Sequence, residues 1–260
     1  GGATTRVSID SRVGIYRRGD GSKAIVAETD DEQIDLGVRD ATVSRLALTV
    51  GEYGYDGLIV RATPEDLETV TAQAAAVPQP VGIGLELNPT DRQEASGAVG
   101  HYRSACDLLL VRGGTPDLNR FAVEDPRADV LTAPMAKQGD VNHVIAAAAA
   151  DNGVAIELNL APVLRASGGR RVQAIRSRRK LIELLEDADA PWVTSADAAD
   201  HLQMRAPRDL IALGEVIGVG ADAIETGLTT WGRLLERSQR RQDPTVIEPG
   251  VYHGRPEDRT

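Results

Sequence analysis

The stretch VGIGLELNPTDRQEASGAVGHYRSACDLLLVRG at residues 81–113 determines the class of fold that we expect. Two short apolar runs stand at its ends, and a more polar segment with a helical pattern separates them. This order is typical of a β-strand, a crossover helix and a second, parallel strand. The same alternation runs through the chain from residue 34 onward, which predicts an α/β domain built on a parallel sheet.

Eight apolar runs are candidate strands of this sheet. In chain order they are IDLGV (34–38), GLIVRA (57–62), VGIGLELN (81–88), DLLLVRG (107–113), ADVLTAP (128–134), VAIELNL (154–160), PWVTSAD (191–197) and ADAIETG (221–227). Eight βα units in about 200 residues match a compact (β/α)8 TIM-like barrel, for which about 250 residues is typical. An open, doubly wound sheet stays the alternative, because the sequence does not show whether the first strand pairs with the last.

Capping residues predict where several helices begin and end. Asp40 and Asp140 are expected to cap the starts of two helices, and Asn152-Gly153 to end the second. The first of these helices has one apolar face, formed by Val43, Leu46, Ala47 and Val50. Pro207 and Thr230 are expected to open two further helices.

The two ends of the chain fall outside the alternating pattern. TRVSIDSRVGIYRR (5–18) and SKAIVAE (22–28), joined through Gly19-Asp20-Gly21, predict a β-hairpin. We therefore expect an amino-terminal extension over 1–33, a barrel over 34–240 and a flexible tail over 241–260. In the alternative assignment, KAIVAE (23–28) is the first barrel strand and IDLGV belongs to the loop after it.

Composition favours a soluble, cytoplasmic protein with a large core. The chain has 260 residues, 42% of them hydrophobic, and no apolar run approaches the roughly 20 residues of a membrane-spanning helix. Its 39 acidic and 29 basic residues give a net charge of −10, and only three of the bases are lysines. That balance indicates a high-salt cytoplasm or a GC-rich genome. In molar salt the Debye length is about 3 Å, so the acidic charge does not exclude an RNA partner.

Polar residues on the predicted strands suggest a cluster at the barrel mouth. Alternation places Glu86 and Glu157 on the lumen face, and Arg61, Arg112 and the Ser195–Asp197 segment at carboxyl-terminal strand ends. Barrel enzymes have their active sites at this end, and a metal-dependent phosphoesterase could use Glu86, Glu157 and Asp197. We favour the other interpretation, in which Arg61 and Arg112 form ion pairs with the two glutamates.

The remaining reactive residue types form no recognisable catalytic or metal motif. The histidines at 101, 143, 201 and 253 lie outside the predicted strands and form no H-x-H pair. Ser167 and Ser195 have no G-x-S-x-G context, and Cys106 is expected to pack as a small hydrophobic residue. Lys137 is expected to be solvated in a loop rather than to form a Schiff base with a carbonyl substrate. We therefore predict no catalytic residue and no metal ligand.

The segment RASGGRRVQAIRSRRK at 165–180 contains seven basic residues and no acid, which is unusual in this acidic chain. On a helix, Arg176, Arg179 and Lys180 share one arc, whereas Ala174, Leu181, Ile182 and Leu185 occupy the opposite side. Such a basic arc is either a solvated face or a phosphate-binding surface, and composition alone leaves both open. The exposed amides expected at Gly168-Gly169 would favour anion binding.

Two segments resemble a known family. Residues 128–171 and 193–219, together with EYGYDGLIVRA (52–62), resemble archaeal ribonuclease P protein component 3, particularly the haloarchaeal type. The similarity depends on the Asn142-His143 helix start, the Asn152-Gly153-Val154 turn, and Ser195-Ala196 followed by Arg205-Ala206-Pro207. It covers roughly residues 41–220, and its specificity comes from the order of these motifs.

The resemblance implies a (β/α)8 barrel related to PHP-type phosphoesterases that serves as a subunit of ribonuclease P, the ribonucleoprotein that removes the 5′ leader of precursor tRNA. In that family the RNA subunit carries out the chemistry, with Mg²⁺ expected on the RNA. The protein would bind no cofactor itself, would pair with ribonuclease P protein component 2, and would meet precursor tRNA indirectly, away from membranes. The alternative is a metal-dependent PHP-like phosphoesterase. The expected RNA-binding residues are Arg112, Lys137, Arg165, Arg170, Arg171, Arg176, Arg179, Lys180, Arg205 and Arg208.

Overall fold

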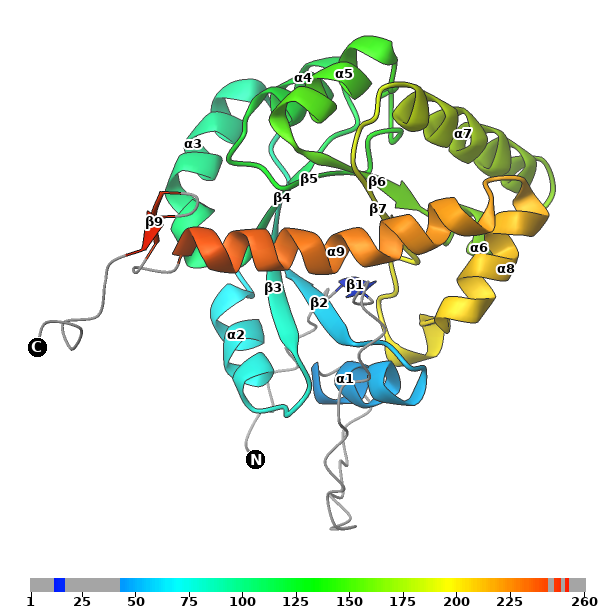
Figure 1. Ribbon diagram of the computed structural model, residues 1–260. Coiled ribbons are helices and arrows are strands. Elements are labelled where there is room, and N and C mark those ends of the chain that lie inside the picture. Colours follow the sequence, from blue (N-terminus) through cyan, green and yellow to red (C-terminus); the bar gives the residue numbers. More distant parts are fainter. Residues whose placement is uncertain (1–11, 17–42, 243–245, 249–250, 253–260) are drawn as a thin grey trace, which may run out of the picture.

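Seven strands form one curled sheet in the computed structural model, which describes residues 12–16, 43–242, 246–248 and 251–252 (Figure 1). The strands are β1 (Arg12–Tyr16), β2 (Gly57–Ala62), β3 (Val81–Leu87), β4 (Leu108–Arg112), β5 (Val130–Thr132), β6 (Ala155–Asn159) and β7 (Trp192–Ser195). They are hydrogen-bonded in chain order. Strands β2 to β7 are parallel, and β1 is antiparallel to β2.

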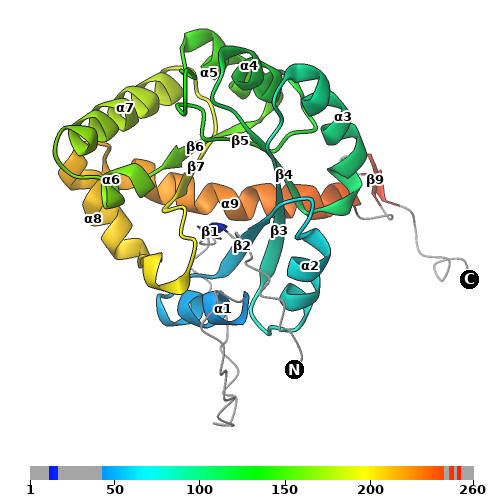
Figure 2. The ribbon, with the colours of Figure 1, turned by 180° about the vertical axis from the view of Figure 1, so that it is seen from behind.

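Helices surround this sheet, as the reverse view makes clear (Figure 2). They are α1 (Val43–Glu52), α2 (Leu67–Ala75), α3 (Arg92–Tyr102), α4 (Pro116–Glu124), α5 (His143–Asn152), α6 (Ala161–Arg165), α7 (Gly168–Asp187) and α8 (Pro207–Ile217), with 3-10 turns η1 (Arg103–Ala105) and η2 (His201–Gln203). The Asn142 side chain, rather than Asp140, caps α5 by accepting hydrogen bonds from the amides of Val144 and Ile145. Gly153 ends the same helix at φ 63°, a left-handed conformation that glycine adopts without strain.

Six of the eight predicted strands are confirmed, as β2 to β7. The run at 34–38 lies outside the described residues, as do Asp40 and the alternative strand at 23–28. The helix with the apolar face at Val43 is α1, and Pro207 opens α8, both as predicted.

The predicted strand at 221–227 is wrong, because these residues begin the long helix α9 (Ala221–Gln242). Ile224, Leu228, Trp231 and Leu235 are buried at spacings of four, three and four residues, which is the period of a helix. The expected helix start at Thr230 therefore lies inside α9. The seven residues ADAIETG are too few to distinguish the start of a buried helix from a strand by their apolar pattern.

Helix α9 crosses the curled sheet and fills its inner face (Figures 1 and 2). Trp231, Leu234 and Leu235 form a buried cluster with the strand residues Ile59, Leu108, Leu110, Val130, Ala155 and Val193. Gly82 on β3 leaves room for this contact, since a Cβ there would lie 2.8 Å from the Ile59 Cδ1 and 3.0 Å from the Leu235 Cδ1. These strand residues come from the amino-terminal halves of their strands, so α9 covers that end.

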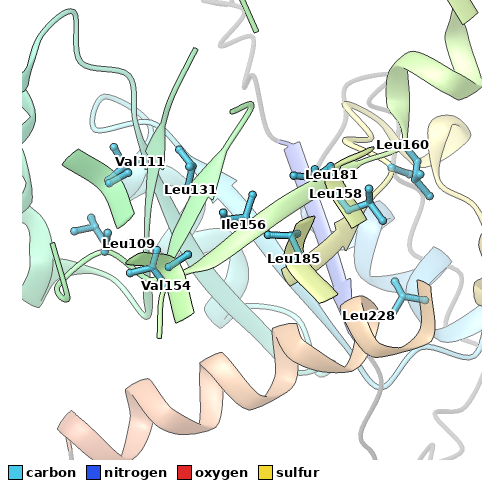
Figure 3. Close-up of a cluster of buried hydrophobic side chains, with 14 of the residues drawn as sticks. Leu109, Val111, Leu131, Val154, Ile156, Leu158, Leu160, Leu181, Leu185 and Leu228 are labelled. Carbon is cyan, nitrogen blue, oxygen red and sulfur yellow. The ribbon is translucent and has the colours of Figure 1, made fainter. Parts of the chain in front are cut away.

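The outer face of the sheet packs against the surrounding helices (Figure 3). Leu109, Leu131 and Ile156 point outward from successive strands and join Leu181 and Leu185 of α7 in a large buried cluster. Alternate residues of the same strands thus serve two cores. This arrangement explains why the strands are apolar over most of their length.

The seven described strands form a curled α/β half-barrel, which is less than the predicted (β/α)8 ring. Within the described residues, β7 forms no backbone ladder with β1, although the two strands approach each other and α9 contacts both. Strand β1 pairs with β2, whereas its predicted hairpin partner at 22–28 falls outside the described residues. Beyond α9, β8 (Val246–Glu248) and β9 (Val251–Tyr252) form a two-stranded sheet. In the described part of the chain, no helix is long and apolar enough to cross a membrane.

Replacing Trp231 by alanine should reduce the free energy of unfolding by about 3–5 kcal/mol, because it empties the contact between α9 and the inner face. Trp231 is fully buried, and its indole N–H donates to the Thr194 carbonyl at 2.9 Å. Chemical denaturation measures the change. Val216→Ala is the control, since Val216 is 82% exposed and its loss should change stability by less than about 0.5 kcal/mol. Similar losses in both variants would contradict this role of α9.

Candidate functional site

The inner face of the sheet changes from apolar to polar toward the carboxyl ends of the strands. This polar half contains Arg61 on β2, Glu86 on β3 and Glu157 on β6. We use the name polar centre for these three residues together with Arg112, Thr132, Ser195 and Asp197. Arg61 is 2% exposed and Glu157 is 1% exposed. The predicted lumen face and its convergence at the strand ends are therefore confirmed.

Arg61 is the cation around which this centre is organised. Its Nη2 is hydrogen-bonded to the Glu157 Oε1, and its Nη1 lies 3.7 Å from the Glu86 Oε1 and 3.7 Å from the Asp197 Oδ1. Arg112 approaches the same Glu86 oxygen with its Nη1 at 3.6 Å. The prediction that Arg61 and Arg112 pair with the two glutamates is therefore confirmed.

Neutral groups also donate hydrogen bonds to the carboxylates of Glu86 and Glu157. The Ser195 hydroxyl donates to the Glu157 Oε1 at 2.6 Å, and the Ala133 amide donates to its Oε2 at 3.1 Å. The Thr132 hydroxyl donates to the Glu86 Oε1 at 2.5 Å. Ala133 and Asp197, the residues just beyond β5 and near the end of β7, adopt left-handed backbone conformations with φ 46°. Backbone strain of this kind persists where surrounding contacts hold it in place.

The electrostatics of the centre stabilise the charged forms of both main partners. Burial by itself would lower the pKa of Arg61, but Glu157, Glu86 and Asp197 raise it above the ordinary arginine value. Burial would likewise raise the pKa of Glu157, but the Arg61 charge and the hydrogen bonds from Arg61, Ser195 and Ala133 hold it below its usual value. The ion pair is thus maintained at neutral pH.

This geometry does not fit a catalytic metal site. The guanidinium of Arg61 already lies among Glu86, Glu157 and Asp197, the three carboxylates that a metal-dependent phosphoesterase would use. Across the described residues, no group of three or more His, Cys, Asp or Glu side chains is arranged to hold a metal ion. His143 begins α5 and His201 begins η2, so neither belongs to the polar centre.

Reactive side chains elsewhere behave as the sequence predicts. Cys106 is buried, and burial raises the pKa of its thiol to about 11, so the thiol stays protonated at neutral pH. Lys137 is exposed in the loop after β5. These environments suit structural roles rather than nucleophilic ones.

Several of the predicted RNA-binding arginines donate hydrogen bonds to backbone carbonyls. Arg165 donates to the carbonyl of Asp197 at 2.8 Å, and Arg171 donates from its Nε to the carbonyl of Val163 at 2.9 Å. Arg205 donates to the carbonyl of Met204 at 2.7 Å. Arg165 and Arg171 therefore lie near the carboxyl ends of β6 and β7, beside the polar centre.

The basic arc predicted for 176–180 is exposed, and the opposite side of α7 is buried as expected. Its members nevertheless have different surroundings. Arg179 donates to the carbonyl of Ile217 at the end of α8, and the Lys180 ammonium lies 3.0 Å from a carboxylate oxygen of Asp140. In the part of the chain that the structure describes, Arg170 and Arg176 make no hydrogen bond or ion pair.

The other predicted cations come from separate parts of the surface. Arg112 belongs to the polar centre and is 28% exposed. Arg208, 89% exposed, lines a cleft of about 490 Å³ between the end of α1 and the start of α8, with Tyr53 and Pro207. Arg112 and Arg208 thus lie on other elements than the basic segment of α7, and the role of all ten residues in RNA binding stays a prediction.

Four arginines were missed in the sequence analysis: Arg178 and a group of three around a buried aspartate. Arg178, within the basic segment but not nominated, donates from its Nε to the Asn159 carbonyl at 2.8 Å, and burial lowers its pKa below the ordinary arginine value. A second group surrounds the buried Asp129 and comprises Arg103, Arg237 and Arg241. These residues are far apart in the sequence, so no local pattern could have indicated that they meet.

Comparison with known proteins decides the family. A family model described as RNase P subunit p30 matches residues 31–243. The chain belongs to the RNase P subunit p30 family. Ribonuclease P protein component 3 of Haloarcula marismortui is 52% identical over 214 residues, covering 82% of this chain and 91% of that protein. The proteins of the same name from Natronomonas pharaonis and Methanosarcina mazei are 50% and 31% identical, over 81% and 80% of this chain and 89% and 88% of their own lengths.

A chain in a solved structure of archaeal ribonuclease P has the same fold. The matching chain comes from a cryo-EM structure of archaeal ribonuclease P with mature tRNA, with a TM-score of 0.70 and 25% sequence identity. The alignment covers 80% of this chain and 93% of that chain. The resemblance to archaeal ribonuclease P protein component 3 is therefore confirmed for this RNase P subunit p30 family member.

Replacing Arg61 by methionine should lower the free energy of unfolding of this RNase P family protein by about 3–5 kcal/mol, because it leaves Glu157 charged and buried without its cation. Urea denaturation measures the loss. Arg120→Met is the control, since the 63% exposed Arg120 pairs with Glu124 on the surface and its removal should change stability by at most about 1 kcal/mol. Equal effects would argue against Arg61 as the central cation.

Stability should also fall in acid because of Glu157. Its pKa is lowered in the folded state, so the folded chain binds fewer protons here than the unfolded chain. The contribution of Glu157 is present above about pH 4.3 and is lost as the pH falls through its lower folded value. Unfolding free energies measured from pH 7 to pH 3 should decline less steeply for Glu157→Gln than for the unsubstituted protein. Parallel declines would contradict this assignment.

Proposed function

We propose that this chain acts as a non-catalytic scaffold subunit of ribonuclease P, which removes the 5′ leader of precursor tRNA, and that the RNA subunit performs the cleavage. The observation that carries the proposal is the polar centre. At the strand ends, where a barrel enzyme holds its reactive groups, a buried guanidinium forms ion pairs with three carboxylates. Family membership supplies the ribonucleoprotein context.

RNA contact would come from arginine side chains on the carboxyl-terminal side of the sheet and on α7. A guanidinium offers paired N–H donors that match phosphate oxygens, and such direct bonds persist where salt screens long-range attraction. The proposed set is that of the sequence prediction: Arg112, Lys137, Arg165, Arg170, Arg171, Arg176, Arg179, Lys180, Arg205 and Arg208. Arg170 and Arg176, on exposed turns of α7, are the members best placed to donate to RNA.

The partners follow from the same reasoning. The chain would bind the ribonuclease P RNA and ribonuclease P protein component 2 in the cytoplasm, and it would contact precursor tRNA only through the assembled particle. Mg²⁺ would act on the RNA subunit. The polar centre supports this division of roles, because its three carboxylates already share Arg61.

Reconstitution tests the proposal directly. Catalytic RNA, component 2 and limiting Mg²⁺ should cleave precursor tRNA faster with this chain than without it, because the protein stabilises the active RNA conformation. The double variant Arg170→Gln, Arg176→Gln should weaken RNA binding and lower the slope of log affinity against log salt by up to about two. Filter binding over a range of KCl concentrations measures the slope.

Arg120→Gln is the matched control, because it removes one exposed positive charge outside the proposed surface. It should leave the cleavage rate and the salt slope unchanged. Cleavage of precursor tRNA by the purified chain without RNA, or full activity of the RNA with component 2 alone, would overturn the proposed function.

A further inference from the structure

A second ionic cluster lies at the amino-terminal ends of the strands, opposite the polar centre. Asp129, fully buried just before β5, is approached by Arg103 from η1 and by Arg237 and Arg241 from α9. The nearest nitrogen–oxygen distances are 2.5, 3.3 and 2.7 Å respectively. We call these four residues the Asp129 cluster. The carboxyl-terminal end of α9 runs beside α3, which explains how these residues meet (Figures 1 and 2).

The carboxylate of Asp129 orders all three guanidinium groups. Its Oδ2 accepts hydrogen bonds from Arg103 and from the Leu109 amide at 2.9 Å, and its Oδ1 accepts bonds from Arg237 and Arg241. Arg103 is held further by the Ser238 hydroxyl at 3.0 Å, and Arg237 by the Gly153 carbonyl at 2.9 Å. The arginines therefore present fixed donors, which lowers the entropy lost when a ligand binds.

The cluster has more positive than negative charge. Three guanidinium groups share the single charge of Asp129, which leaves two positive charges in a chain whose net charge is −10. Among the described residues, Asp107 also touches the cluster: its backbone carbonyl accepts a bond from Arg103, and its carboxylate accepts one from the Ile83 amide. Including Asp107 still leaves one positive charge. The adjacent Arg127 and Arg240 are balanced by their own carboxylates, Asp125 and Glu236.

The excess charge is accessible at the surface. The side chains of Arg237 and Arg241 are 39% and 42% exposed, whereas Arg103 is 21% exposed. A guanidinium has five N–H donors, and the hydrogen bonds in the described structure use one of those on Arg241. The exposed arginines thus keep donors for a ligand while Arg103 lies deeper beside Asp129.

We propose that Arg237 and Arg241, ordered by Asp129, bind the phosphodiester backbone of RNA at the end of the sheet opposite the polar centre. This inference rests on the proposed function and adds an RNA contact that the predicted set does not include. Oriented planar guanidinium groups suit the bidentate recognition of phosphate oxygens. RNA carries a row of phosphates, and each phosphate that an arginine neutralises releases counterions, which favours binding.

The test uses the full chain with the double variant Arg237→Gln, Arg241→Gln. This variant keeps Arg103, so Asp129 retains a cation and a backbone donor. Binding to ribonuclease P RNA, measured over a range of KCl concentrations, should weaken, and the salt slope should fall by about two because two phosphate contacts are lost. Arg237→Lys, Arg241→Lys keeps the charges and should restore most of the slope. Arg120→Gln should behave like the unsubstituted chain.

A purely structural role for the cluster would give a different result. Thermal unfolding, recorded for every variant, would then shift while the salt slope of folded protein stayed unchanged, which would overturn the inference. If the double variant fails to fold, Arg241→Gln alone should lower the slope by about one. A cluster variant that binds RNA normally but component 2 poorly would assign the surface to a protein and also overturn it.

The outcomes separate this inference from the proposed function. If the unsubstituted chain does not bind the RNA, both fail. If it binds, and the Arg170 and Arg176 variant lowers the salt slope while the Asp129-cluster variant does not, the proposed function stands and this inference falls.

Discussion

The inner face of the curled sheet must be packed with side chains, and two different layers of side chains pack it. Near the amino-terminal strand ends the filling is apolar and comes from α9 through Trp231 and Leu235. Near the carboxyl-terminal ends it is ionic and centres on Arg61, whose guanidinium carbon lies 5.7 Å from the centre of a Trp231 ring. The apolar and ionic layers therefore meet where Arg61 lies over Trp231. The Arg61 charge is stabilised both by the carboxylates and by the face of the Trp231 ring.

The sequence predicted the features that local patterns encode. Short apolar runs between helical patterns located β2 to β7, and alternation along two of these strands placed Glu86 and Glu157 on the inner face. The pairing with Arg61 and Arg112 followed from the need to neutralise buried carboxylates. The apolar side of α7 followed from the helical period. These predictions depend on spacing within one element or on charge balance across neighbouring strands, so a single sequence is sufficient for them.

The features that were missed depend on contacts between distant segments. ADAIETG resembles a strand in isolation, and only the continuation through Trp231 and Leu235 shows the helical period of α9. The pairing of β1 with β2 joins segments about forty residues apart, with no turn motif to link them. The Asp129 cluster brings together Arg103 from η1, Asp129 from the segment before β5 and Arg241 from α9. Local patterns do not indicate this meeting, because they divide α9 into a strand and a shorter helix.

The two ionic centres have opposite consequences because their charge balances differ. At the polar centre, Glu86, Glu157 and Asp197 face Arg61 and Arg112, so three negative charges meet two positive ones and no positive charge is left over. At Asp129, three arginines meet one carboxylate, and the excess lies on partly exposed side chains. A mostly buried network with no excess positive charge holds the fold in one geometry and offers little to an anionic ligand. A partly exposed excess of positive charge is what the proposed contact with a polyanion requires. A scaffold for RNA needs both, since ordered phosphate contacts on a rigid sheet can fix the shape of a flexible nucleic acid without any reactive group.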